Sequence, residues 1–167
     1  MNDTALTGEL LLDDGVGTVR LDDVYGTRID DLWDAITSPA RVGRWLGTVT
    51  GELRLGATLQ LSFVSGWDGP ARIEVCEAPR HLVLVANPGQ ADETRMTAEL
   101  TAEGARTRLV IEESGFTIDA LPFHGSGWQT HVEDLRSYLE GRATSHWETR
   151  WKELTPAYLE LAERIAR

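Results

Sequence analysis

The feature that most constrains the fold of this chain is an apolar stripe in its last third. After a loop that Pro122 interrupts, Gly127 opens a segment in which large apolar residues recur at intervals of 4, 3 and 4. These residues are Trp128, Val132, Leu135 and Leu139. The spacing places all four side chains along one side of an α-helix, so another layer of the structure has to cover that side.

The segments that precede this helix have a period of two and predict the covering layer. Leu59, Leu61 and Phe63 alternate with polar residues, and similar alternation recurs between residues 72 and 111. A continuously apolar run over residues 82–85 is typical of a central strand. The helix is therefore expected to pack on a sheet.

Two short helices are predicted ahead of these strands. Extended runs at residues 9–12 and 16–25 flank an Asp-Gly turn and predict a β-ribbon at the start of the chain. A helical stripe follows over residues 29–36, and Ser38-Pro39 has the form of an N-cap before a first-turn proline. Runs of strands with the helices set apart favour an α+β fold with an antiparallel sheet.

The composition limits the class of partner. At 167 residues with 41% hydrophobic residues, the chain is long enough for one well-buried core. A formal net charge of −11 means that nucleic acids and anionic membrane surfaces would repel the protein. Cys76 is the single cysteine, and no apolar run is long enough to span a membrane. We therefore expect no nucleic-acid partner, no membrane insertion and a cytoplasmic location.

The segment after residue 141 carries a second, heptad-like stripe. It comprises Trp147, Trp151, Leu154, Tyr158, Leu161 and Ile165. Exposed on a monomer, it would form a large apolar patch. We predict either a homodimer through Trp147, Trp151 and Tyr158 or a segment that folds back onto its own sheet. Pro156 predicts a kink or a fresh helix start within the stripe.

The order of these elements, with five short motifs, resembles the Aha-type branch of the START-like superfamily, also called SRPBCC or helix-grip proteins. The resemblance spans residues 19–141. Its motifs are Asp31 to Pro39 with Trp45, Arg54-Leu55-Gly56, Glu77 to Leu82, Glu113 to Phe116, and Gly127-Trp128 through Glu140. The resemblance implies an α+β helix-grip fold, with a hydrophobic cavity between a curved antiparallel sheet of about six to seven strands and the long C-terminal helix. It also implies two short helices after the first strand.

The domain boundaries follow from this resemblance. We expect residues 1–141 to form the START-like domain and residues 142–167 to form a helical extension of it. The chain departs from the family pattern at Gly56-Ala57, where a second glycine is usual, and at Val85 to Pro88, where a tryptophan often closes the strand. Losing that ring would widen or reshape the implied cavity. The resemblance carries no catalytic residue.

Six ring side chains are predicted to gather near the implied cavity. They are Trp45, Phe63, Trp67, Phe116, Trp128 and His131. Large rings offer broad contact to a flat apolar ligand, and core packing is the alternative role, most of all for Trp128. Trp67 lies in a turn, which favours a lid or a contact with a partner.

No catalytic residue, metal or cofactor is predicted. Histidine side chains ordinarily titrate near neutrality, so His124 and His131 are candidate acid–base groups. Their spacing does not suit a pair of metal ligands on one helix. Glu112 and Glu113 point to opposite faces of a strand, so they cannot act as a carboxylate dyad. Turn, cap and solvated-face roles account for the adjacent acids.

Three functions fit these features. The leading hypothesis is a START-like domain that binds a small hydrophobic molecule without catalysis. The second is an interaction module, a chaperone co-factor or stress-response partner, that uses Trp67 and the C-terminal stripe. The third is a cyclase- or aromatase-like enzyme with His131 or His124 as a proton shuttle.

Overall fold

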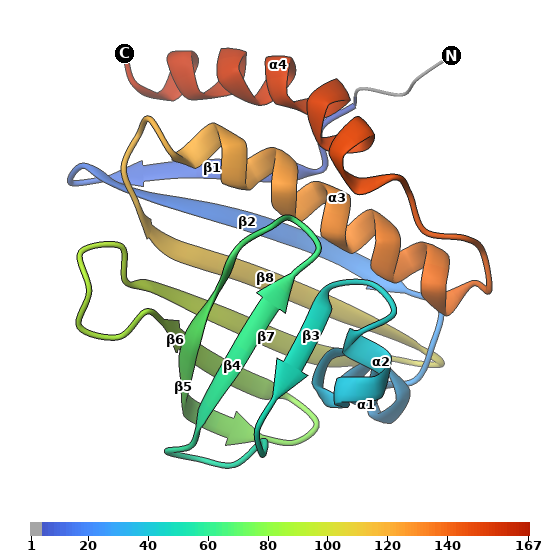
Figure 1. Cartoon of the computed structure of the whole chain (residues 1–167). Coiled ribbons are helices and arrows are strands. Elements are labelled where there is room, and N and C mark those ends of the chain that lie inside the picture. The colour runs from blue at the N-terminus through green and yellow to red at the C-terminus, as the bar shows by residue number, and fades with distance from the viewer. Residues whose placement is uncertain (1–4) are drawn as a thin grey trace.

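Eight strands form one antiparallel sheet in the computed structural model, which describes residues 5–167 (Figure 1). Across the sheet the strands follow the order β1-β2-β8-β7-β6-β5-β4-β3. The sheet curves, but its edge strands do not pair with each other, so it stays open. The strands are β1 Gly8–Asp13, β2 Val16–Tyr25, β3 Gly47–Thr50, β4 Thr58–Phe63, β5 Asp68–Glu77, β6 His81–Ala86, β7 Thr94–Glu103 and β8 Arg106–Phe116.

Four helices complete the fold of residues 5–167. α1 (Ile29–Thr37) and α2 (Pro39–Val42) carry the chain from β2 to β3 at the far edge of the sheet. α3 (Leu121–Leu139) lies against β1 and β2, and α4 (Trp147–Ile165) packs on α3 and β1. Figure 1 shows α3 between α4 and the sheet.

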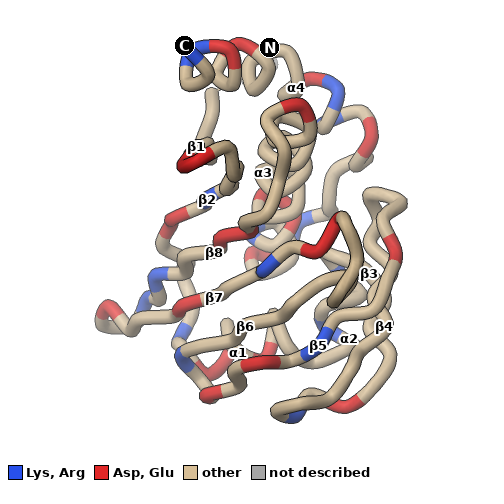
Figure 2. The backbone as a smooth tube through the Cα atoms, turned by 90° about the vertical axis from the view of Figure 1, so that its left-hand side faces the viewer, with Lys and Arg blue, Asp and Glu red and all other residues tan. Residues whose placement is uncertain are grey.

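Charged residues of both signs lie along the strands of the sheet (Figure 2). Arg20 on β2 pairs with Glu112 on β8 at 2.6 Å, and Arg108 on β8 pairs with Asp22 on β2 at 2.7 Å. Successive strand residues point to opposite faces, so the alternate residues of these strands, such as Val19, are buried on the inner face. The core therefore lies between the inner face and the helices.

The sheet has more strands than the resemblance implied. It has eight strands instead of about six to seven, and the two short helices follow the second strand, not the first. β3 is the additional strand, an edge strand of 4 residues. So short a segment contains too few alternations to be recognised by its period.

The prediction that the long helix starts at Gly127 is wrong. α3 begins at Leu121 and has Pro122 in its first turn. Proline is tolerated there because the first N–H groups of a helix have no intrahelical acceptor. The apolar stripe is confirmed, since Trp128 and Leu135 are 7% and 0% exposed.

The C-terminal stripe folds back onto its own chain. Leu154 and Tyr158 are both 0% exposed where α4 packs on α3 and β1. The Tyr158 hydroxyl donates to Gln129 Oε1 at 2.6 Å and accepts from the Gly8 N–H at 3.0 Å. Of the two alternatives for this stripe, the structure shows the intrachain one, and Tyr158 is not available to a second copy of the chain.

Of the two alternatives predicted at Pro156, a kink or a fresh helix start, the fresh start is not found. α4 is one helix from Trp147 to Ile165, with Pro156 inside it. A proline within a helix leaves the carbonyl four residues earlier without its usual donor. That carbonyl belongs to Lys152, an exposed residue, so water can serve as the donor.

Gly125 marks a close approach of α3 to Tyr158, and replacing it tests this packing. A Cβ at Gly125 would lie 2.7 Å from Tyr158 Cδ1 and 2.9 Å from Leu10 Cδ2. Because hydrogen bonds hold Tyr158 in place, we expect Gly125→Ala to lower the free energy of unfolding by about 1–3 kcal/mol, even though alanine favours helix.

Gly127→Ala is the matched control, because a Cβ there would first meet Trp147 at an ordinary 3.6 Å. It is expected to be neutral or to stabilise the fold by up to about 1 kcal/mol. Urea denaturation measures both variants. Equal stabilities for the two variants would contradict the packing of α4 on α3.

Candidate ligand-binding site

Two neighbouring cavities lie between the sheet and the helices. The first, here called the inner chamber, has a volume of about 90 Å³, and the second, here called the aromatic groove, has a volume of about 660 Å³. Phe63, Met96 and Trp128 line both. These three side chains therefore form the boundary between them.

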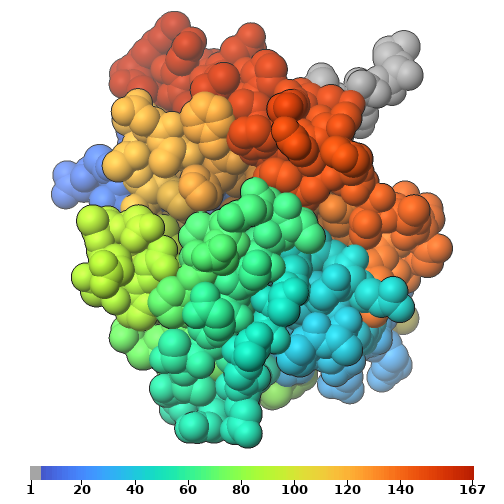
Figure 3. All heavy atoms as spheres, in the orientation of Figure 1, coloured from blue at the N-terminus to red at the C-terminus, as the bar shows by residue number. Residues whose placement is uncertain are grey.

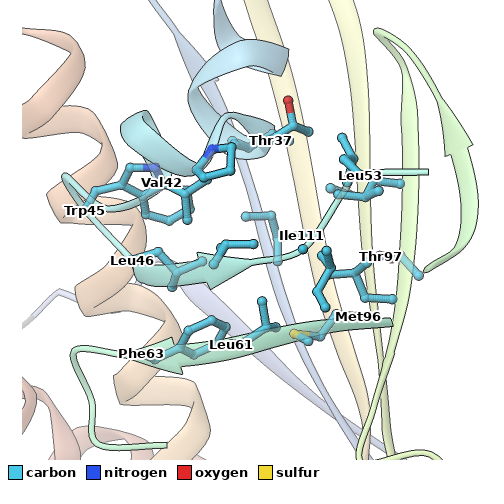
Figure 4. Close-up of a pocket in the computed structure, with 18 of the residues that line it drawn as sticks. Thr37, Val42, Trp45, Leu46, Leu53, Leu61, Phe63, Met96, Thr97 and Ile111 are labelled. Carbon is cyan, nitrogen blue, oxygen red and sulfur yellow. The ribbon is translucent and has the colours of Figure 1, made fainter. Parts of the chain in front are cut away.

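The inner chamber is bounded by α1, α2, β3, β4 and the inner face of β6 to β8 (Figure 4). Its walls are apolar except for Thr37, Thr97 and the indole N–H of Trp45, which donates to the Ala35 carbonyl at 3.0 Å. A volume of about 90 Å³ is well below the roughly 300 Å³ at which small-molecule sites begin. The chamber has room for a small substituent but not for a whole ligand.

The aromatic groove opens mainly between three segments that are distant in sequence. They are the β4–β5 turn, the end of β8 with the first half of α3, and the start of α4. Figure 3 shows these segments meeting at the surface in green, gold and orange-red. A volume of about 660 Å³ falls within the roughly 300–1,000 Å³ of small-molecule sites.

Ring side chains form much of the wall of the aromatic groove. Phe116 stacks on His124 with ring centroids 4.1 Å apart, and Trp147 stacks on Trp151 at 5.8 Å. The other rings that line the groove are Phe63, Trp67, Phe123, Trp128 and His131. Rings at such separations attract one another through their faces and edges, and a flat molecule can use the same interactions.

His131 is 3% exposed and lies among three of these rings. Its centroid is 5.7 Å from Phe63, 5.5 Å from Trp128 and 5.3 Å from Trp147. The Trp147 indole N–H donates to His131 Nδ1 at 3.2 Å, so this nitrogen carries no proton. Burial lowers the pKa of His131 to about 3. A neutral imidazole with so low a pKa is poorly matched to proton transfer near neutrality.

Glu113 is a buried carboxylate in the wall of the groove, at 9% exposure. Its Oε1 accepts from the Trp128 indole N–H at 2.8 Å, and its Oε2 accepts from the Thr94 hydroxyl at 2.6 Å. Desolvation raises the pKa of Glu113 against the opposing effect of these two hydrogen bonds. The solvated-face role predicted for this residue is wrong, whereas Glu112 does point outward to Arg20.

The match to a protein family agrees with this architecture. The model of the family described as Activator of Hsp90 ATPase homolog 1-like protein matches residues 27–140, more than half of the chain. The chain belongs to this family. The Aha-type resemblance is therefore confirmed, as is the helix-grip fold in which α3 packs on a curved antiparallel sheet.

Solved structures share the fold of this chain. The crystal structure of CalU16 from Micromonospora echinospora has a TM-score of 0.75 and 22% identity, covering 93% of this chain and 96% of that chain. DynU16, from the dynemicin biosynthetic locus, has a TM-score of 0.71 and 24% identity over 80% of this chain and 51% of that chain. EF2215 from Enterococcus faecalis has a TM-score of 0.77 at 13% identity, covering 95% and 91%. No match was found among curated proteins.

Most of the side chains predicted to contact a ligand come together in the aromatic groove of this family member. Phe63, Trp67, Phe116, Trp128 and His131 all line it. Trp45 does not: it lines the inner chamber and is 4% exposed. Trp67 packs on Phe63 with centroids 5.1 Å apart, so it forms part of the wall and does not project from its turn.

Sequence reasoning did not place several other side chains in the groove. Among them are Glu113, Phe123, Trp147 and Trp151. The two tryptophans were visible as the start of the C-terminal stripe, but the stripe does not show which element it packs on. The position of Glu113 was indicated more weakly. It is an alternate residue to the buried Ile111 on β8, so both side chains point to the same face of the sheet.

Neither a metal centre nor a membrane-spanning helix is found in the part of the chain that the structure describes. Within residues 5–167, His, Cys, Asp and Glu side chains nowhere form a group of three or more that could hold a metal ion. No helix of this part has the length and apolarity needed to cross a membrane. The absence of a metal or cofactor stays a prediction.

Proposed function

We propose that the protein binds a small, flat, largely apolar molecule in the aromatic groove and does not catalyse a reaction on it. The observation that carries this proposal is the groove itself, a space of about 660 Å³ with ring side chains over much of its wall. Binding sites for small molecules combine such apolar walls with a few fixed polar groups. Here Glu113, held by Trp128 and Thr94, is a polar group of that kind.

The helix after residue 141 supports the proposal because the groove is incomplete without it. Trp147 and Trp151 of α4 supply one wall, and Trp147 bonds to His131 of α3. We therefore propose that residues 142–167 extend the domain formed by residues 1–141. The ligand-binding site would span both parts.

One solved structure of the same fold supports the proposal. DynU16 is described as belonging to the dynemicin biosynthetic locus, which links one protein of this fold to the making of a small molecule. The family description leaves a chaperone partner as the alternative. The packing of Trp67 against Phe63, and of Trp147 against Trp151, favours the ligand, because these rings face a shared cavity.

A binding titration with flat aromatic compounds tests the proposal. We expect wild-type protein to bind such compounds with quenching of its tryptophan fluorescence, measured in parallel by calorimetry. Trp67→Ala removes one wall and is expected to weaken binding about tenfold, because one ring contact contributes on the order of 1 kcal/mol.

Trp33→Ala is the matched control, since Trp33 is half-buried like Trp67 and lines neither cavity. It is expected to leave affinity unchanged. Absence of binding by the wild-type protein across the compound set would contradict the proposed function. So would equal affinities in Trp67→Ala and wild type.

A further inference from the structure

The charged residues of the aromatic groove all have one sign. Its walls include Asp92, Glu113 and Glu148, and no lysine or arginine lines it in the part of the chain that the structure describes. Its histidines add no positive charge near neutrality, because burial lowers the pKa values of both His124 and His131. The groove therefore presents a negative potential to a ligand, within a chain of net charge −11.

Two of the three acids already have partners within the protein. Glu148 pairs with Lys152 at 2.8 Å, and Asp92 accepts from the side-chain amide of Asn87 at 3.0 Å. Both acids are exposed, so solvent screens them. They contribute to the potential but do not define a binding point.

Glu113 differs because it is buried and has no cationic partner. Its hydrogen bonds come from two neutral donors, Trp128 and Thr94, and it forms no ion pair among residues 5–167. A buried carboxyl group is normally either paired with a positive charge or held in its neutral form, because desolvation makes the isolated anion costly, and the raised pKa of Glu113 reflects this cost. A carboxylate has about four acceptor positions, of which two are used here, so its oxygens can still accept from a ligand.

The rings around the groove complement a cation as well. Indole and phenyl faces attract ammonium groups through their quadrupoles, most strongly for tryptophan. Trp67, Trp128, Trp147 and Trp151 all line the same space as Glu113. Aromatic walls with one buried, unpaired carboxylate are the combination that recognises an amine attached to an apolar scaffold.

We infer that the ligand of the aromatic groove is an organic cation, a flat aromatic molecule that carries a protonated amine, and that Glu113 is its anionic anchor. The inference rests on the proposed function and narrows it to one ligand class. The aromatic part of the ligand contacts the tryptophan and phenylalanine walls. Its ammonium group donates to Glu113 and supplies the missing positive charge.

A matched series of probes tests this inference on the wild-type protein. Naphthylmethylamine, naphthylmethanol and naphthoate share one ring system and are cationic, neutral and anionic at neutral pH. We expect the amine to bind at least about tenfold more tightly than the alcohol, and the carboxylate to bind most weakly, by calorimetric titration at low salt.

Glu113→Gln removes the charge and retains an acceptor for Trp128 and a group that can bond to Thr94. The variant is expected to bind the amine only as tightly as it binds the alcohol. Its affinity for the alcohol is expected to equal that of the wild-type protein. Glu112→Gln is the control, because Glu112 lies next in sequence on the outer face. It is expected to bind all three probes like wild type.

The outcomes separate the two proposals. Equal wild-type affinities for the amine and the alcohol would overturn the cation inference and leave the proposed function standing. Failure of all three probes to bind would overturn both. Because the probe series is read in the wild-type protein, the test holds even if a Glu113 variant fails to fold.

Discussion

Replacing Tyr158 with alanine is expected to lower the free energy of unfolding by about 3–5 kcal/mol, the range for removing a large buried aromatic side chain. The Tyr158 ring is 0% exposed and contacts α3 at Gly125. Its hydroxyl also links Gly8 of β1 to Gln129 of α3. The variant therefore loses apolar packing, leaves the Gly8 N–H without its acceptor and removes one of the two donors to Gln129 Oε1, the other being the Thr7 N–H.

Two further variants separate these contributions. Tyr158→Phe keeps the ring and is expected to cost about 1–3 kcal/mol from the hydrogen bonds alone. Leu159→Ala, at the next position, changes a side chain that is 39% exposed and is expected to shift stability by less than about 0.5 kcal/mol. Urea denaturation compares all three. If Tyr158→Ala were no less stable than Leu159→Ala, α4 would not be docked as described.

Acidification from about pH 6.5 towards pH 3 is expected to cost the protein on the order of 4 kcal/mol of stability through His131 alone. Burial lowers the pKa of His131 in the folded protein to about 3, whereas the unfolded chain takes up the proton near the usual value of about 6.5. The stabilising contribution is therefore fully present above about pH 6.5 and is lost as the pH falls.

Other groups modify this dependence in known directions. His124 acts in the same direction, since burial lowers its pKa too. Glu113 acts in the opposite direction: its pKa is raised by desolvation, so its contribution is present at low pH and is lost as the pH rises. The His131 effect is best isolated as a difference between two proteins measured over one pH series.

His131→Asn provides that difference, because its amide oxygen can accept from Trp147 but does not titrate. Unfolding of both proteins is measured by urea denaturation between pH 4 and pH 8. The variant is expected to be less stable at pH 8 because it fills less space, and to lose less stability than wild type as the pH falls. If the free energies of unfolding of the two proteins changed in parallel with pH, the prediction would be contradicted, because the imidazole of His131 would then titrate as it does in water.

The overall fold was largely accessible from the sequence because its signals are local and repeated. Alternation along β4 and β7 identified strands, and the spacing from Trp128 to Leu139 identified the gripped helix. The elements that were not predicted have weak local sequence patterns. β3 is too short for a period, and the first turn of α3 contains a proline and is followed by two glycines, of which close packing explains Gly125 but not Gly127.

The site was less accessible, because its composition depends on contacts between segments far apart in the chain. Rings on β4, β8 and α3 could be expected to converge once the fold was inferred. The docking of α4 could not, since a stripe such as Trp147 to Tyr158 packs equally well on a second copy or on its own chain. Glu113 was assigned to the solvent-exposed face, because an acidic residue in an alternating strand is typical of that face unless the direction of its side chain is known.

The most direct test of ligand binding in the aromatic groove is a crystal structure of the protein with naphthylmethylamine bound. We predict electron density for the ring among Phe116, Trp67 and Trp147, with the amine nitrogen at hydrogen-bond distance from a Glu113 oxygen. A groove closed by its own side chains, or a probe bound elsewhere on the protein while the groove stays empty, would contradict the account.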